Sequence, residues 1–302
     1  MVVKNRVIYT QGEVAISGVV GVTFETAQNA TFTLTVPREN VNAMGYEGTV
    51  DRPQLDATDA TLEFAFIPAK AGTSTDLTGP DLGSLMADSL LADPARSQVW
   101  CAGVGMLGKD GTPAVDGGPQ NSALLNSISV DAAVGAMPTT TLGWTGVAEA
   151  IPSVVAPGDA STLTVSLVEP KDIVLDSATF GQGQPAAPSN DGNLTPNEGC
   201  AQSGAVAWDL PVEVILCLSD DPADEGKAFG NPPGTASFTV ESLKNEIDAS
   251  ERARNYTLVI GDFGYTLSKA RIDSKTNSMA VGDLFGTFNY VLGGTADGMV
   301  CA

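Results

Sequence analysis

The segment 103–110 (GVGMLGKD) has the glycine spacing of loops that bind phosphate. It contains both G-x-G-x-x-G and G-x-x-x-x-G-K, in which glycines let backbone N–H groups approach an anion. The residue after Lys109 is Asp110, whereas a Walker loop needs Ser or Thr there to hold its metal ion. The following DGTPAVDGGP cannot form the helix that a dinucleotide fold requires. The pattern therefore favours a glycine-rich strand end and turn over a nucleotide site.

Two acidic segments have residue types that could bind calcium. Asp220, Asp221, Asp224 and Glu225 lie close together, but SDDPADEGK lacks the spacing of an EF-hand loop. The segment 191–196 starts like a calcium loop, but Pro196 stands where that loop needs glycine. Solvated turns are the favoured interpretation of both. No metal ion and no other cofactor is expected.

The chain has no histidine, which excludes Ser-His-Asp and Cys-His nucleophile pairs and His-ligated metal sites. Its four cysteines form no C-x-x-C pair, and their wide spacing favours buried thiols in a reducing compartment over two disulfides. They are Cys101, Cys200, Cys217 and Cys301. We therefore expect a protein that is not an enzyme. Glycoside hydrolysis by two carboxylates stays open, although nothing singles out a pair among the 36 acids.

The chain has few charged residues, and most of them are acidic. In 302 residues, 15 Lys and Arg oppose 36 Asp and Glu, giving a net charge of −21, while charged residues make up only 17%. A basic surface that embraces nucleic acid is excluded, because such affinity comes mainly from Lys and Arg on phosphates. The N-terminal sequence has no apolar region like that of a signal peptide, and no segment reaches about 18 apolar residues. We expect no membrane partner and synthesis in the cytoplasm.

Most of the chain alternates between apolar and polar residues, as half-buried strands do. The clearest runs are Val14 to Ile16, Val20 to Phe24, 31–36 (TFTLTV), 61–66, 163–167, 212–218, 256–260 and 285–291. Gly and Pro, 33 and 18 residues, are spread along the chain and punctuate these runs. Trp100, Trp144 and Trp208 are expected in the core. The fold class predicted is mainly β, an antiparallel β-sandwich or barrel with one or two short helices and long loops.

Two segments have apolar residues at helical spacing. The first is 82–91, where Pro94 stops the run, and the second is 240–247, with Val240, Leu243 and Ile247 on one face and Thr239 as a cap. Long loops are predicted at 69–80 and 181–204, where large apolar residues are almost absent. The chain is one β-rich subunit, or two β halves with a seam near 108–125.

Two stretches resemble segments common in tail structural proteins of tailed bacteriophages. They span 30–69 and 126–149, and the second has a strand leading into Val134-Gly135, then Pro138-Thr139 and another strand. The residues that carry the resemblance, and that it implies are used in assembly, are Arg38, Glu39, Asn40, Val41, Asn42, Gly45, Asp51, Arg52, Pro53, Gly135 and Pro138.

The resemblance implies a tail-tube (major tail) protein, a virion component that packs into rings, usually six-fold, stacked into a hollow tube. Its expected partners are other copies of itself, other tail proteins, and genome DNA that passes without specific binding. The acidic composition fits this role, since a negative wall does not retain DNA. The alternatives are another virion structural protein (capsid, decoration or tail terminator) or a β-sandwich carbohydrate-binding or lytic module.

Overall fold

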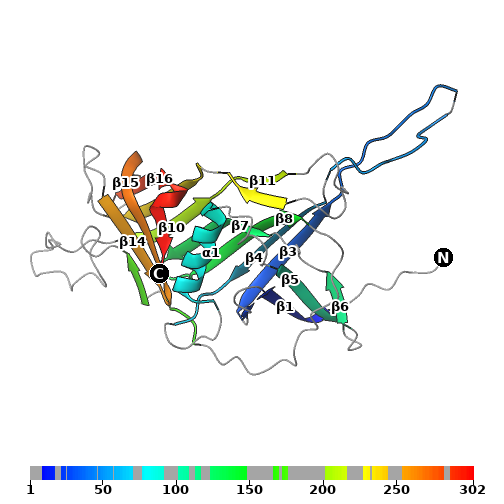
Figure 1. The fold of residues 1–302 in the computed structure, drawn as a ribbon. Helices are drawn as coiled ribbons and strands as arrows, with labels where there is room; N and C mark the ends of the chain where they lie inside the picture. Colours follow the sequence, from blue (N-terminus) through cyan, green and yellow to red (C-terminus); the bar gives the residue numbers. More distant parts are fainter. Residues whose placement is uncertain are drawn as a thin grey trace, which may run out of the picture.

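A computed structural model describes residues 9–17, 22–24, 26–45, 47–56, 58–70, 77–91, 101–108, 113–116, 123–147, 166–169, 172–175, 201–215, 227–231, 233–243, 254–281 and 286–302. Within these residues the chain is mainly β with one α-helix, as predicted (Figure 1). The largest sheet is antiparallel and is not closed into a barrel, so the barrel alternative is wrong, and a sandwich or sheet fold fits.

The strands form one large and two small sheets. The large sheet has the order β3-β4-β8-β7-β10-β13-β16-β15-β14-β9, with β17 also paired to β15. Its strands are β3 (Ala27–Thr35), β4 (Asp59–Phe66), β8 (Thr139–Val147), β7 (Leu124–Ala133), β10 (Ala201–Asp209), β13 (Thr235–Ser242), β16 (Thr287–Thr295), β15 (Phe263–Ser278), β14 (Arg254–Ile260), β9 (Ile173–Leu175) and β17 (Met299–Cys301). The small sheets are β2 (Val22–Phe24), β1 (Tyr9–Ser17), β5 (Cys101–Gly108) and β6 (Pro113–Asp116), and β11 (Val212–Ile215) with β12 (Lys227–Gly230).

One side of the large sheet forms the core. Alternation sends every second side chain of β4, β8, β7, β10, β13 and β16 to this side, including Phe64, Trp144, Trp208, Phe238 and Tyr290, each nearly or completely buried. The helix α1 (Gly79–Leu91) covers part of it, contacting β7, β12, β15 and β17. The prediction of Trp144 and Trp208 as core residues is confirmed, whereas Trp100 lies outside the described residues.

Strand β15 leaves the plane of the large sheet part-way along its length. Phe263 to Leu267 pair with β14 and β17, whereas Arg271 to Ser278 pair with β16 across a bulge. Between the two parts Lys269 has a φ of 55°, an uncommon backbone conformation for a residue with a side chain, and its N–H donates to Asn255 Oδ1 at 3.1 Å. The bend separates the part of β15 that pairs with β14 and β17 from the part that pairs with β16.

A second contact ties the sheets together through aromatic rings. The Phe24 ring in β2 lies 4.7 Å from Phe64 and 5.0 Å from Phe66 in β4, measured between ring centroids. Phe66 in turn lies 5.9 Å from Phe263 in β15. Such tilted pairs contribute beyond the apolar area they bury. They fix the small N-terminal sheet and the bent part of β15 against the same end of β4.

The helix predicted at 82–91 is confirmed, and its start lies earlier than predicted. Thr78 Oγ1 donates to Asp81 Oδ2 at 2.6 Å, while the Asp81 N–H reaches Thr78 Oγ1 at 3.4 Å. This reciprocal pair caps the helix and shortens the predicted 69–80 loop, because Gly79 and Pro80 are helical. An added Cβ on Gly83 would meet the carbonyl oxygen of Cys301, so glycine lets β17 approach the helix closely.

The helix predicted at 240–247 is wrong where the structure describes it. Val240 lies in β13, and its neighbours Phe238 and Ser242 are buried while Thr239 and Glu241 face the other side. The alternation continues from Ala236 and is satisfied by strand pairing on both sides, so the helical spacing of Val240 and Leu243 is coincidental. Thr239 is therefore not a cap. Residues 244–253 lie outside the described residues.

The other predicted loop and the predicted seam have mixed outcomes. Residues 201–204, expected at the end of the 181–204 loop, form the start of β10, paired with β7 and β13. The strand was not predicted because its small residues, such as Ser, Gly and Ala, differ little in hydropathy and show no clear alternation. The rest of this loop lies outside the described residues. Strand β4 pairs with β8, so the large sheet uses residues from both sides of the proposed seam at 108–125.

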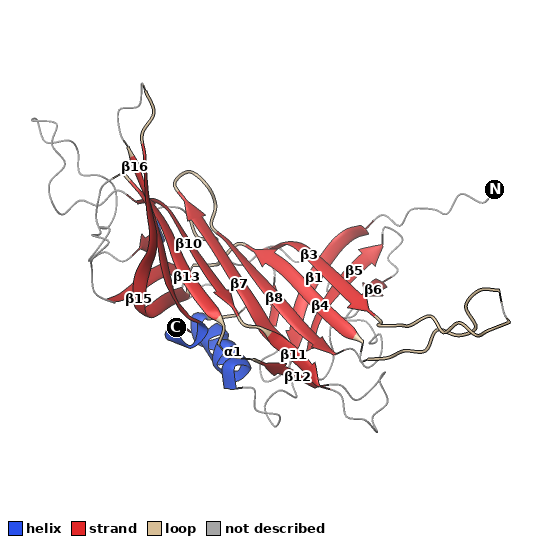
Figure 2. Ribbon diagram, turned by 90° about the horizontal axis from the view of Figure 1, so that it is seen from above, coloured by secondary structure: helices blue, strands red, loops and turns tan. Residues whose placement is uncertain are grey.

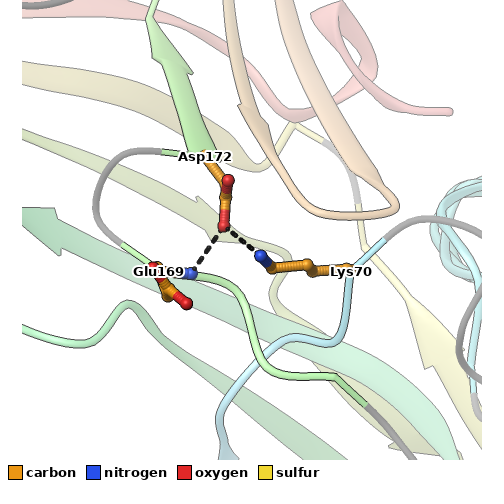
Figure 3. Close-up of polar contacts among 3 residues, drawn as sticks. All are labelled: Lys70, Glu169 and Asp172. Atoms are coloured by element: carbon orange, nitrogen blue, oxygen red, sulfur yellow. Dashed lines mark hydrogen bonds and ion pairs between the residues drawn. The ribbon is translucent and has the colours of Figure 1, made fainter.

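The connection after β4 is held by an ion pair. Lys70 Nζ lies 2.9 Å from Asp172 Oδ2, and the Glu169 N–H donates to the same oxygen at 3.1 Å (Figure 3). Ala69 and Leu167 bridge alongside. Because both charged side chains are partly exposed, the pair orients the connection and adds little stability.

Candidate assembly arm and acidic sheet face

A long hairpin, 36–58, projects from the sheet between β3 and β4; we call it the arm (Figure 1). Bridges between Arg38 and Gln54 and between Val41 and Asp51 hold its two sides together. The Val41 N–H donates to the Asp51 carbonyl at 2.9 Å, and the Val50 N–H donates to the Val41 carbonyl at 2.8 Å. The arm therefore satisfies some of its own backbone groups without resting on the core.

The tip and base of the arm use residues suited to turns. Gly45 and Gly48 have φ values of 94° and 99°, which a residue with a side chain rarely adopts. At Asp51, the carboxylate Oδ1 accepts the N–H of Arg52 at 2.7 Å. Toward the base, Gln54 Nε2 donates to the carbonyl of Asp56 at 2.9 Å and to Thr58 Oγ1 at 3.1 Å. These local bonds give the arm a defined shape.

The residues that carry the tail-protein resemblance fall at two opposite ends of the large sheet. Nine of them lie on the arm: Arg38, Glu39, Asn40, Val41, Asn42, Gly45, Asp51, Arg52 and Pro53. The other two, Gly135 and Pro138, lie in the turn between β7 and β8. Gly135 has a φ of 79°, which this turn requires, and Pro138 is buried. The structure therefore does not bring all eleven residues into one site.

The side of the large sheet away from the core has an unusual composition. Seven adjacent strands, β3, β4, β8, β7, β10, β13 and β16, contain no Lys or Arg. Their side chains on this side are mostly Thr, Ser, Ala and Gly, and the acids among them are Asp59, Glu63, Asp131, Asp209 and Glu241, with Asp59 at the edge beside the arm. We call this surface the sheet face. Figure 2 looks onto the broad array of these strands.

The strand register places the face residues in rows. One row follows the Cα pairing from Thr31 through Glu63, Gly143, Ser127 and Asp209 to Thr235. The next rows contain Thr141, Ser129, Ala207 and Ser237, and then Thr139, Asp131, Ala205 and Thr239. Neighbouring strands lie about 4.8 Å apart, so the face is a broad, shallow surface of hydroxyl groups with scattered carboxylates. The surface of these seven strands repels a polyanion and presents no cation to its phosphates. The next strand, β15, adds Arg271 on the same side, since Arg271 pairs with Gly293 and Gly293 pairs with Ser237.

The base of the arm has one carboxyl group in a perturbed environment. Partial burial, and secondarily the nearby charge of Asp56, raise the pKa of Asp59. Because the folded-state pKa lies above the unfolded one, this group favours folding below its unfolded pKa. That contribution is lost as the pH rises through the folded pKa.

We therefore expect Asp59→Asn to raise stability modestly at pH 7, by up to about 0.5 kcal/mol, because most of the carboxylate remains in water. The gain should shrink as the pH falls through the acidic range in which Asp59 titrates, and urea denaturation at several pH values measures it. Glu63→Gln, on an exposed residue of the same strand, controls for the loss of one negative charge. An equal effect of the two substitutions would contradict the local cause.

Two titratable groups in the described part of the core have raised pKa values and are protonated at neutral pH. Cys301 is a free, buried thiol, as predicted for it, and burial raises its pKa to about 12. Burial also raises the pKa of Tyr265, whose ring is completely enclosed. Both groups therefore stay protonated at neutral pH and act as packing residues. Cys101 pairs through its backbone in β5, and Cys200 and Cys217 lie outside the described residues.

The sequence patterns first examined for chemistry do not form a site in the described residues. The glycine-rich segment 103–108 lies within β5, paired with β1 and β6, so its backbone groups belong to a sheet and not to a loop before a helix. The acids at 220–225 and the segment 191–196 lie outside the described residues. Among the residues the structure does describe, no three His, Cys, Asp or Glu side chains gather closely enough to hold a metal ion.

Comparison of the chain with protein-family models and with curated proteins finds no match. None of the helical segments in the described part of the chain has the length and apolar character that crossing a bilayer requires. The arm and the sheet face are therefore the features from which a function can be argued.

Sequence reasoning located the residues of the arm but missed the sheet face. The signal was present, because seven predicted or observed strands contain five acids and no base. The net charge of the whole chain does not say which strands carry the acids and which carry the bases. Counting basic residues strand by strand would have found the surface.

Proposed function

We propose that this protein is a virion structural protein of the tail-tube class, whose copies assemble into stacked rings around a channel for DNA. The sheet face is the observation that carries the proposal. A duplex that slides through a channel must not exchange its counterions for Lys or Arg, because that exchange is the source of non-specific binding. Seven adjacent strands without a basic residue, with acids and hydroxyl groups on the solvent side, supply such a wall.

The projecting arm supports the same proposal independently. A hairpin that extends from the fold and exposes apolar side chains is typical of a subunit whose surface is completed by neighbours. The arm lies at one end of the sheet, so a contact with another copy through it is heterologous and builds an open polymer. The resemblance to tail structural proteins includes nine arm residues, from Arg38 to Pro53. In this proposal the chain is made in the host bacterial cytoplasm and ends up in the tail.

Negative-stain electron microscopy of the purified full-length chain tests the proposal. We expect rings and hollow tubes at high protein concentration, and no retention of duplex DNA at about 50 mM salt. Closed shells would indicate a capsid or decoration protein instead. A monomer that never assembles, or one that binds DNA or cleaves a glycan, would overturn the proposal.

A further inference from the structure

The large sheet contains the same arrangement of four strands twice, side by side (Figure 2). The strands β3, β4, β7 and β8 lie in the order β3-β4-β8-β7, and β10, β13, β15 and β16 lie next to them in the order β10-β13-β16-β15. In each set the first strand pairs with the second, the second with the fourth, and the fourth with the third. We call the sets unit 1 and unit 2, where β15 contributes its part Arg271 to Ser278. Unit 2 is therefore unit 1 repeated along the sheet.

The residue pairing repeats together with the strand order. Adding 174 to a residue number of β3 and 176 to one of β4 turns every β3–β4 pair into a β10–β13 pair, so that Thr31–Glu63 becomes Ala205–Thr239. A constant offset likewise relates β4–β8 to β13–β16, and β7–β8 to β15–β16. Because a slip by one residue turns every side chain to the opposite face, a shared register is a demanding match.

Two irregularities of the sheet also occur twice, at equivalent positions. One lies at the start of the first strand of each unit, and the other lies in the third strand. The register shifts are between Ala27 and Asn29 and between Ala201 and Ser203, and then between Leu125 and Ser127 and between Ile272 and Ser274. Such bulges are retained among related strands, so their recurrence indicates a common origin of the two units.

The connections repeat as well. A hairpin joins the first strand to the second in both units, the arm in unit 1 and β11–β12 in unit 2. Between the second and third strands, β5 pairs with β1 and β6, as β14 pairs with β9 and the start of β15. At equivalent positions after the third strands, the sequences Ala133-Val134-Gly135 and Ala280-Val281-Gly282 are identical. The chain is therefore a tandem duplication with its boundary between β8 and β9.

The two outer edges of the duplicated sheet are equivalent to the two edges that meet at its centre. At the centre, β7 of unit 1 pairs with β10 of unit 2. Their equivalents are β15 and β3. Among the described residues, β3 pairs only with β4, and the part 271–278 of β15 pairs only with β16. An unpaired edge is a template for another strand, so the strand that suits β15 of one chain is β3 of a second copy.

We infer that the chain is a fused pair of equivalent units and that three chains, not six, close one ring; the inference deepens the proposed function and rests on it for the size of the ring. Each chain supplies the eight strands from β3 to β15. Strands about 4.8 Å apart and tilted by about 40° give two chains a wall about 32 Å across and three chains a wall about 48 Å across, between backbones. Inward side chains take about 10 Å from either diameter. Three chains are therefore the smallest number that leaves a hydrated duplex room to slide.

The central junction predicts which residues meet between chains. Ala207 in β10 pairs with Ser129 in β7, and their equivalents are Thr33 and Thr276. All four side chains are exposed. We expect Thr33→Cys with Thr276→Cys in one chain to form chain-to-chain disulfides with oxidised glutathione, because directly opposed Cβ atoms lie about 4.5–5.5 Å apart. Ser129→Cys with Ala207→Cys is the matched control, which should form the same bond within a single chain.

The size of the cross-linked product counts the chains in a ring. Under denaturing electrophoresis we expect bands of one, two and three chains, the largest near 93 kDa, three times 30.9 kDa. The control variant should run as one chain. Products of four to six chains would overturn the inference. It would also be overturned if the variant cross-linked no more than oxidised wild-type protein, which accounts for the native cysteines.

End-on electron micrographs and mass photometry of the wild type separate this inference from the proposed function. Rings of three chains that never stack into tubes would support the inference and refute the tube proposal. Tubes built from rings of six chains would refute the inference alone.

Discussion

Lysine at four of the five acids of the sheet face is expected to convert a surface that repels DNA into one that binds it. The substitutions are Glu63→Lys, Asp131→Lys, Asp209→Lys and Glu241→Lys. Each reversal replaces an exposed or half-exposed carboxylate on β4, β7, β10 or β13 with a cation on the same broad surface. We expect duplex binding with a Kd of about 10⁻⁴ to 10⁻⁶ M, the range typical of sequence-independent contacts.

The salt dependence identifies the cause. If lysines release counterions from the duplex, the logarithm of the affinity falls with the logarithm of the salt concentration, with a slope of about −0.9 for each phosphate contacted. A filter-binding or anisotropy titration between about 50 and 200 mM salt measures that slope. The wild type should show no binding over this range.

A second quadruple variant serves as the control, because it has the same net charge but carries its four lysines elsewhere on the molecule. Glu39→Lys, Glu47→Lys, Glu213→Lys and Asp297→Lys change four exposed acids that lie off the sheet face. If DNA affinity depended only on net charge, the two quadruple variants would bind equally. We expect much weaker binding by the control, because its lysines are divided among the arm, β11 and the turn before β17 and do not share one broad surface. Equal binding by both would remove the argument for a specialised face.

The strands were predictable because one face of each meets an apolar core. In β4 apolar and polar residues alternate, and Phe64 and Leu62 are buried while Thr61 and Glu63 are exposed, as the pattern indicates. Alternation fails as a guide where small residues replace the apolar ones. The start of β10, AQSG, therefore cannot be predicted as a strand from its own sequence. It is a strand because β7 and β13 pair with it.

The helix predicted at 240–247 is wrong for a related reason, because the apolar residues there fit two periods. Val240, Leu243 and Ile247 match a helical period, but Phe238 and Val240 match a strand period just as well. A single sequence does not say which partner is near. Phe238 and Val240 lie between β10 and β16, whose hydrogen bonds decide in favour of the strand.

The sequence singles out residues of the arm, but it does not predict that they form a hairpin that projects from the fold. These residues stood out through a resemblance, which included Gly45 and the Asp51-Arg52-Pro53 turn, but no hairpin was predicted there. Whether such a hairpin lies on the core or projects from it depends on what it can pack against. Val41, Met44 and Val50 are exposed because no described element covers them, and this is information that only the three-dimensional arrangement contains.

Truncation of one tryptophan should show how far the sheet face and the arm depend on the core beneath them. Trp208 lies in β10, between β7 and β13, with 1% of its surface exposed. Its Nε1–H donates to the carbonyl of Ala296 at 3.0 Å, and the Ala296 N–H donates to the carbonyl of Gly234 at 3.1 Å. The ring therefore supports the middle of the sheet and also fixes the turn that leads into β17.

We expect Trp208→Ala to lower the free energy of unfolding by about 3–5 kcal/mol, because it leaves a large cavity and removes a buried hydrogen bond. Trp208→Phe keeps most of the apolar volume and should cost less, with the lost hydrogen bond accounting for about 0.5–1.5 kcal/mol, since the Ala296 carbonyl still accepts the N–H of Met299. Urea denaturation of both variants measures the difference. A loss below about 1 kcal/mol for the alanine variant would mean that Trp208 does not anchor the sheet. Since the polymer draws on folded subunits only, the alanine variant should also assemble at a higher total concentration, in proportion to its unfolded fraction.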